Sequence, residues 1–150
     1  MSIQISKKAE LFYKAMEDIW VAEQIWQGSP NNAVWHCTQA VEKTMKGFLR
    51  CLNKDYEYGH ELKDLLDAID DVTALSTDVT TYILYFDRFG VGLRYRNMTS
   101  DPTIGEAKSA IGRAKLVLGE LECNVDVARF VNEAREVHHK MLRLSLQYED

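Results

Sequence analysis

NAVWHCTQAVEKTMKGFLR, residues 32–50, is the stretch that decides the fold of this 150-residue chain. At about 100° per residue in a helix, its polar side chains fall within an arc of roughly 80°; they are His36, Gln39, Lys43, Lys46 and Arg50. The apolar side chains, with Leu52 just beyond the stretch, fall on the opposite face; they are Val34, Cys37, Val41, Met45, Phe48 and Leu52. We therefore expect a helix that packs on one face and offers donors and positive charge on the other.

The composition indicates one globular domain over residues 1–150. The chain is 46% hydrophobic and 27% charged, with two prolines, which is typical of a folded protein and favours helices. Its net charge of -5 argues against a protein that coats nucleic acid non-specifically. We find no secretory leader and no apolar run long enough to span a bilayer, so we expect a cytoplasmic protein without membrane contact.

Five further helices are predicted from apolar spacing and from helix-start signals. Their expected ranges are about 7–27, a short helix from His60, about 79–89, a helix from about 103, and about 125–147. The start signals are Ser6, Ser29-Pro30, the capping box Thr103-x-x-Glu106, and Asn124. Two glycines and Pro102 predict a loop over residues 90–102. The fold class is thus all-α, an antiparallel up-and-down bundle. Whether the last two helices are continuous stays open.

Several residue types invite a chemical interpretation. Three cysteines without a CxxC spacing predict buried, reduced thiols; they are Cys37, Cys51 and Cys123. Glu136-x-x-His139 has no second copy, so we expect no metal and no cofactor. Asp18 lies close to the apolar stripe of the first helix and needs a partner, for which we expect an Arg or an amide from another helix. Trp20, Trp35 and Phe130 need cover from the last helix or from a second subunit.

Four motifs in order resemble the HEPN domain family (higher eukaryotes and prokaryotes nucleotide-binding). The first is Ala15-x-x-Asp18-x-x-x-Ala22, and the second is Gln39-Ala-Val-Glu-Lys43 with Lys46. The third is His60-x-Leu62-x-x-Leu65-Leu66, and the fourth is Arg94-Tyr-Arg-Asn97 before an Ala-rich helix. The resemblance implies a homodimer and a bundle of four to five core helices over about 7–121, with an extra C-terminal helix at about 125–147.

The resemblance also frames the function. Ribonuclease members of the family carry R-x(4–6)-H, in which Arg holds phosphate and His moves a proton. In this chain Asp101 stands where the His is expected, and no His lies between His60 and His138. We therefore expect a non-catalytic module that binds a nucleotide, an RNA or a protein partner, such as a nucleotidyltransferase. The alternative is a ribonuclease toxin of a toxin–antitoxin pair, with a degenerate site that uses Arg94 or Arg96 and Asp101.

The candidate anion site combines the arginine-rich segment with part of the polar face of residues 32–50. Its residues are Arg88, Arg94, Arg96, Asn97, Gln39 and Lys43. Guanidinium groups beside the amides of a helix start at Thr103 would suit a phosphate. The competing interpretation is that one Arg pairs with Asp18, that the other arginines are solvated, and that the polar face simply meets water.

Overall fold

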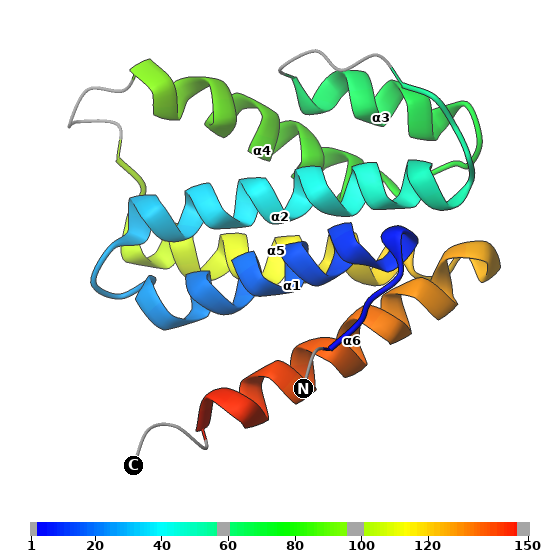
Figure 1. Ribbon diagram of the computed structural model, residues 1–150. Helices are drawn as coiled ribbons and strands as arrows, with labels where there is room; N and C mark the ends of the chain where they lie inside the picture. The colour runs from blue at the N-terminus through cyan, green and yellow to red at the C-terminus, as the bar shows by residue number, and fades with distance from the viewer. Residues whose placement is uncertain (1–2, 57–60, 96–100, 147–150) are drawn as a thin grey trace.

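The protein is a bundle of helices (Figure 1). The computed structural model describes residues 3–56, 61–95 and 101–146, with the backbone alone for residues 90–95. Within these residues the elements are all helical: α1 (Lys7–Ile25), α2 (Pro30–Cys51), α3 (Leu62–Asp70), α4 (Thr77–Tyr95), α5 (Ile104–Leu121) and α6 (Val125–Leu146). The expected all-α bundle is confirmed. None of these helices is long and apolar enough to cross a membrane.

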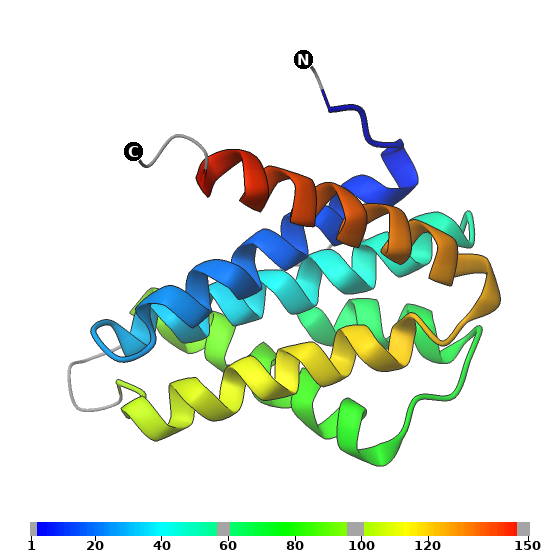
Figure 2. The same cartoon turned by 90° about the horizontal axis from the view of Figure 1, so that it is seen from below.

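Helix α2, which contains the stretch of residues 32–50, lies at the centre of the bundle. It packs against each of the other five helices, and its most extensive partner is α1. Figure 1 and Figure 2 show α1, α2 and α5 side by side, with α3 and α4 on one side of α2 and α6 crossing α1 on the other. The central position follows from the sequence, because α2 has a broad apolar face.

The predicted apolar face of α2 forms the middle of the core. Its residues Val34, Cys37, Val41, Met45 and Phe48 are buried, and Leu52 is partly buried. Helices α1 and α2 approach each other closely at Gly47. A Cβ atom there would lie 3.0 Å from two ring atoms of Phe12, which is itself fully buried. Gly47 therefore permits an approach of the two helices that a larger residue would obstruct.

The helix-start signals are confirmed at two positions. The Thr103 hydroxyl accepts a hydrogen bond from the backbone N–H of Glu106 (3.1 Å), and α5 begins at the next residue after Thr103. The Asn124 side chain accepts from the N–H of Asp126 (2.9 Å), so α6 is a separate helix from α5. Both caps satisfy amide groups that have no partner inside the helix.

Ser6 and Ser29 precede helices as predicted, but neither caps one with its side chain. Ser6 instead binds Glu133 of α6 through its N–H (2.8 Å) and its hydroxyl (3.0 Å). The Ser29 hydroxyl accepts from the side chain of Asn32 (2.8 Å), while Pro30 opens α2 as expected. The correction has a common cause: a nearby side chain competes with the backbone amide for each serine hydroxyl.

Two further predictions are corrected. The loop expected over residues 90–102 is wrong in its first half, because α4 continues to Tyr95. Glycine costs only about 1 kcal/mol inside a helix, so two glycines do not end one by themselves. The three cysteines are not all buried, since Cys123 is exposed whereas Cys37 and Cys51 are buried.

Candidate functional site

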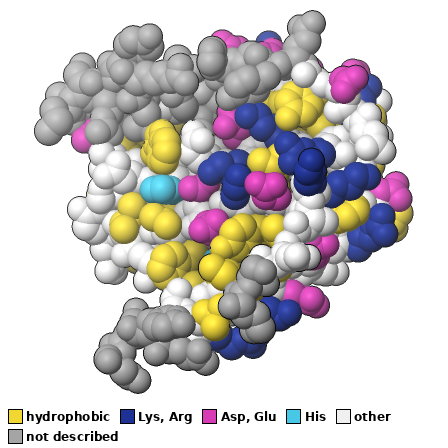
Figure 3. All heavy atoms as spheres, viewed as in Figure 1, with side chains coloured by type: hydrophobic (Ala, Val, Ile, Leu, Met, Phe, Trp, Pro, Cys, Tyr) yellow, Lys and Arg dark blue, Asp and Glu magenta, His cyan; other side chains and the backbone are white. Residues whose placement is uncertain are grey.

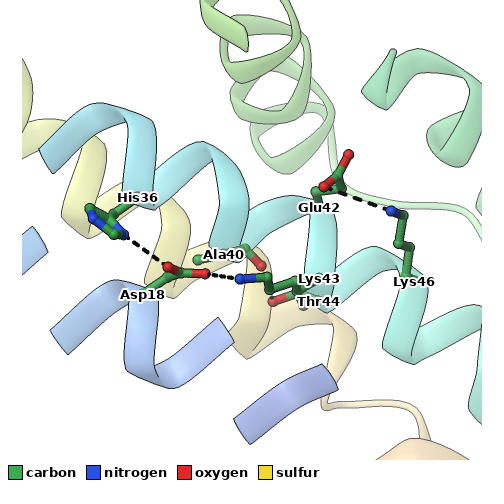
Figure 4. A network of polar contacts seen from close by, with 7 residues as sticks. All are labelled: Asp18, His36, Ala40, Glu42, Lys43, Thr44 and Lys46. Atoms are coloured by element: carbon green, nitrogen blue, oxygen red, sulfur yellow. Dashed lines mark hydrogen bonds and ion pairs between the residues drawn. The ribbon is translucent and has the colours of Figure 1, made fainter. Parts of the chain in front are cut away.

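A buried carboxylate joins α1 to the polar face of α2. Asp18 is only 8% exposed, and it accepts a hydrogen bond from the ammonium group of Lys43 (2.5 Å) through Oδ2. Its other oxygen, Oδ1, lies 2.9 Å from Nδ1 of His36. Figure 4 shows the carboxylate between these two side chains of α2. We call Asp18, His36 and Lys43 the α1–α2 brace.

The brace corrects the sequence-based expectation for Asp18. An Arg or an amide was expected as the partner, and an Arg from the segment before Thr103 was the competing interpretation. Both are wrong, because the partners are a Lys and a His. His36 and Lys43 are two helical turns apart on one face, so each can reach an oxygen of a carboxylate that lies between them.

The brace determines what the polar face of α2 can do chemically. Lys43 already neutralises Asp18, so its charge is largely compensated within the protein. His36 offers its remaining ring nitrogen, while Nδ1 is held by a carboxylate that orients the ring. Further along the same face, Lys46 lies 3.7 Å from Glu42, one turn earlier (Figure 4). The face therefore carries paired charges, and Figure 3 shows acidic and basic side chains alternating along it.

The other candidate residues are spread over α2, α4 and the segment before α5. Arg88 is exposed on α4, and Asp101 is partly buried immediately before Pro102. Arg94 lies on the last turn of α4, but its side chain is outside the described residues, as are Arg96 and Asn97. Gln39 is partly buried on α2, between the two brace residues of that helix.

The structure brings the elements of the candidate anion site to the same end. In Figure 1 the end of α4, the start of α5 and the start of α2 lie together at the left. Farther from this end, Arg113 in the middle of α5 stacks on Tyr82 (5.6 Å) and Tyr85 (4.9 Å) of α4. Burial raises the pKa of the Tyr85 hydroxyl and the negative charge of Glu106 adds to the rise, while the positive charges of Arg113 and Arg88 act against it. Arg88, Arg113 and Glu106 thus all act on Tyr85, and this part of α4 and α5 carries charges of both signs.

The histidines of α6 lie elsewhere, against α1. His138 makes an edge contact with Tyr13 (6.1 Å between ring centroids), and burial lowers the pKa of His138, with His139 adding to the effect. Among the residues that the structure describes, no group of three or more His, Cys, Asp or Glu side chains is placed to hold a metal ion. Glu136 and His139 are therefore not part of a larger ligand set within those residues.

Sequence reasoning found Asp18, His36 and Lys43 separately and missed that they form one unit. The seven-residue spacing of His36 and Lys43 was a usable signal, because it places both side chains on one helix face, where they can bind the two oxygens of a carboxylate from an adjacent helix. The spacing did not say which neighbouring helix would supply that carboxylate.

Comparison with known proteins places the bundle in context. The family model described as HEPN domain matches residues 7–124. Among solved structures, the archaeal HEPN homologue ST0689 is 19% identical with a TM-score of 0.65, over 79% of this chain and 97% of that chain. TT1696 from Thermus thermophilus is 20% identical with a TM-score of 0.67, over 79% of this chain and 98% of that chain. No curated protein matches. Helix α6 follows the matched residues.

Proposed function

The chain belongs to the HEPN domain family, and from this premise we propose that it is a non-catalytic module that binds the phosphate of a nucleotide or RNA. One observation carries the proposal: no His follows Arg88, Arg94 or Arg96 at the spacing of the family's ribonuclease motif. A ribonuclease of that type needs a group that moves a proton near neutral pH. Asp101 stands at the corresponding place, and its negative charge would oppose a phosphate.

The arginine-rich end of the bundle supports a binding role. Arg88 is exposed on α4, and the start of α5 lies at the same end (Figure 1). The positive end of a helix dipole and guanidinium groups both favour phosphate. Lys43 contributes less than the sequence indicated, because it is paired with Asp18. The ligand would therefore contact Arg88, Arg94 and Arg96 rather than the middle of α2.

A titration tests the proposal. The purified protein is titrated with ATP, GTP and a short RNA, and the integrity of the RNA is followed in the same samples. We expect saturable binding without cleavage, and a loss of affinity of about tenfold or more in Arg96→Ala, as for a charged hydrogen bond. Arg143→Gln on exposed α6 is the matched control and should bind as the wild type does. Absence of binding would refute the proposal, whereas cleavage that disappears in Arg96→Ala would show a ribonuclease and exclude a module that only binds.

We also propose that the protein acts as a homodimer. Trp20 and Trp35 are 41% and 44% exposed, and large apolar side chains of this kind are frequent at interfaces. Sedimentation equilibrium should give twice the monomer mass, and Trp35→Gln should weaken association without lowering helix content. A wild-type monomer at high micromolar concentration would contradict the proposal.

The proposal of a nucleotidyltransferase partner rests on the family resemblance alone. Co-purification with a nucleotidyltransferase encoded beside the gene tests it.

A further inference from the structure

A second positively charged feature lies at the opposite end of the bundle from the arginine-rich segment. It is a hollow of about 370 Å³ where α1 begins, α2 ends and α6 begins. Its polar and aromatic lining is Lys8, Asn53, Asp126, Arg129 and Phe130. We call it the Lys8–Arg129 pocket. In Figure 1 these three helix ends lie together at the right, away from the start of α5.

Two cations converge on one aromatic ring in this pocket. The ammonium group of Lys8 lies 5.6 Å from the ring centroid of Phe130, and the guanidinium carbon of Arg129 lies 4.5 Å from it. Within the described part of the chain, neither cation forms an ion pair. Asp126 is the acidic residue of the lining, so the two positive charges are only partly compensated.

The pKa of the Cys51 thiol, which also lines the pocket, is affected by the nearby positive charges. Burial raises the pKa of Cys51 to about 11, and the positive charges of Lys8, Arg129 and Arg50 each act against that rise. No carboxylate contributes to the shift. Lys8 and Arg129 thus lie close enough to Cys51 to favour a negative charge in this part of the pocket.

The backbone around the pocket contributes less to the potential than these side chains do. Helices α1 and α6 both begin here, and the start of a helix carries the positive end of its dipole. Helix α2 ends here with the opposite sign, and two of its last carbonyl groups accept hydrogen bonds from residues beyond the helix. Asn53, at φ 52°, lets its own N–H bond the carbonyl of Arg50 (3.1 Å) and the N–H of Lys54 bond that of Leu49 (2.9 Å). Glu133 already accepts from the N–H of Ser6 at the start of α1, and Asn124 caps α6. The positive potential therefore comes mainly from the side chains of Lys8 and Arg129.

We propose that the Lys8–Arg129 pocket binds the phosphate group of a small phosphorylated molecule. The volume is near the lower end of ligand pockets, about 300–1,000 Å³, which suits a sugar phosphate better than a large cofactor. Lys8 and Arg129 provide charge-assisted donors for the phosphate oxygens, and Phe130 provides an apolar surface beside them. The inference does not depend on the proposed function, because the two sites share no residue and lie at opposite ends of the bundle.

Calorimetric titration with ribose 5-phosphate, and with ribose as the phosphate-free control, tests the pocket. We expect saturable binding of ribose 5-phosphate only. Lys8→Gln/Arg129→Gln should weaken it about tenfold or more, as the loss of two charged contacts requires. The matched control is Lys140→Gln/Arg143→Gln, which removes the same two charges from an exposed part of α6 and should leave binding unchanged. Circular dichroism is used to check that both variants are folded.

Cysteine alkylation followed by mass spectrometry locates the ligand. Cys51 is buried, so the label is placed by Val125→Cys, because Val125 lines the pocket and is 84% exposed; Cys123 is exposed elsewhere and serves as an internal reference. Ribose 5-phosphate should slow the alkylation of the thiol introduced by Val125→Cys relative to Cys123, and the effect should persist when Arg96→Ala is added. The proposal is overturned if ribose binds equally well, if Lys8→Gln/Arg129→Gln binds as the wild type does, or if the introduced thiol is not protected at saturation.

Discussion

Two glycine-to-alanine substitutions should change stability in opposite directions. Both glycines lie inside helices, Gly47 in α2 and Gly112 in α5. At Gly112 a new Cβ meets no atom within 4 Å, whereas at Gly47 it would lie 3.0 Å from Cε1 and Cζ of Phe12. Phe12 has no exposed surface, so its ring has no free space into which it can move. The pair separates the effect of helix propensity from the effect of the close approach.

The magnitudes follow from two opposing terms. Replacing Gly with Ala inside a helix stabilises it by about 1 kcal/mol, and this gain applies at both positions. Overpacking a filled core costs about 1–3 kcal/mol, and this loss applies only at Gly47. We therefore expect Gly112→Ala to gain about 1 kcal/mol and Gly47→Ala to lose about 1 kcal/mol. For a chain of this length, the difference corresponds to melting temperatures about 4–8 °C apart.

Thermal and urea denaturation followed by circular dichroism measure both variants against the wild type. Phe12→Leu provides a further check, because the shorter side chain makes room for the new methyl group. The destabilisation caused by Gly47→Ala should shrink in that background, which a double-mutant cycle detects. If Gly47→Ala raises the melting temperature as much as Gly112→Ala does, the α1–α2 contact is not limited by Phe12, and the reasoning is refuted.

Three other predictions concern ionisable groups. Asp18→Asn should destabilise the protein by about 1–3 kcal/mol, because it leaves Lys43 without its anion in a partly buried place. Adding Lys43→Met should restore much of the lost stability. Urea denaturation that finds the effects of the two substitutions additive would contradict this prediction. Burial lowers the pKa of His138 from its ordinary value of 6.5, so folding disfavours its protonation. The contribution of neutral His138 to stability is present above pH 6.5 and is lost as the pH falls below 6.5 through the folded-state pKa. The free energy of unfolding, measured by urea denaturation across this pH range, should therefore depend less on pH in His138→Gln than in the wild type. A thiol reagent at pH 8 should modify exposed Cys123 well before Cys37, whose pKa burial raises to about 12, and equal rates in the folded protein would argue against that burial.

The sequence was sufficient for the helices and for their faces, because both depend on local patterns. The start of α5 is an example, since Thr103 and Glu106 carry their own capping chemistry wherever the helix packs. The end of α4 is the counter-example. Glycine lowers helix propensity without forbidding a helix, so residues 90–95 could be assigned only with knowledge of the surrounding fold.

The brace shows why the candidate site was harder to predict than the fold. Periodicity tells which side of a helix is buried, but a contact between two helices also needs their register. Here Gly47 fixes the register, because Phe12 of α1 packs against it. The short turn after α1 makes the two helices antiparallel, so six residues onward from Phe12 is Asp18, and six residues back from Gly47 is Val41. That position lies between His36 and Lys43, and the carboxylate accordingly reaches both of them. The contact between Gly47 and Phe12 thus identifies the partners of the buried Asp18.

The same reasoning could not place the Lys8–Arg129 pocket, because its cations come from opposite ends of the sequence and meet only through the packing of α6 against α1.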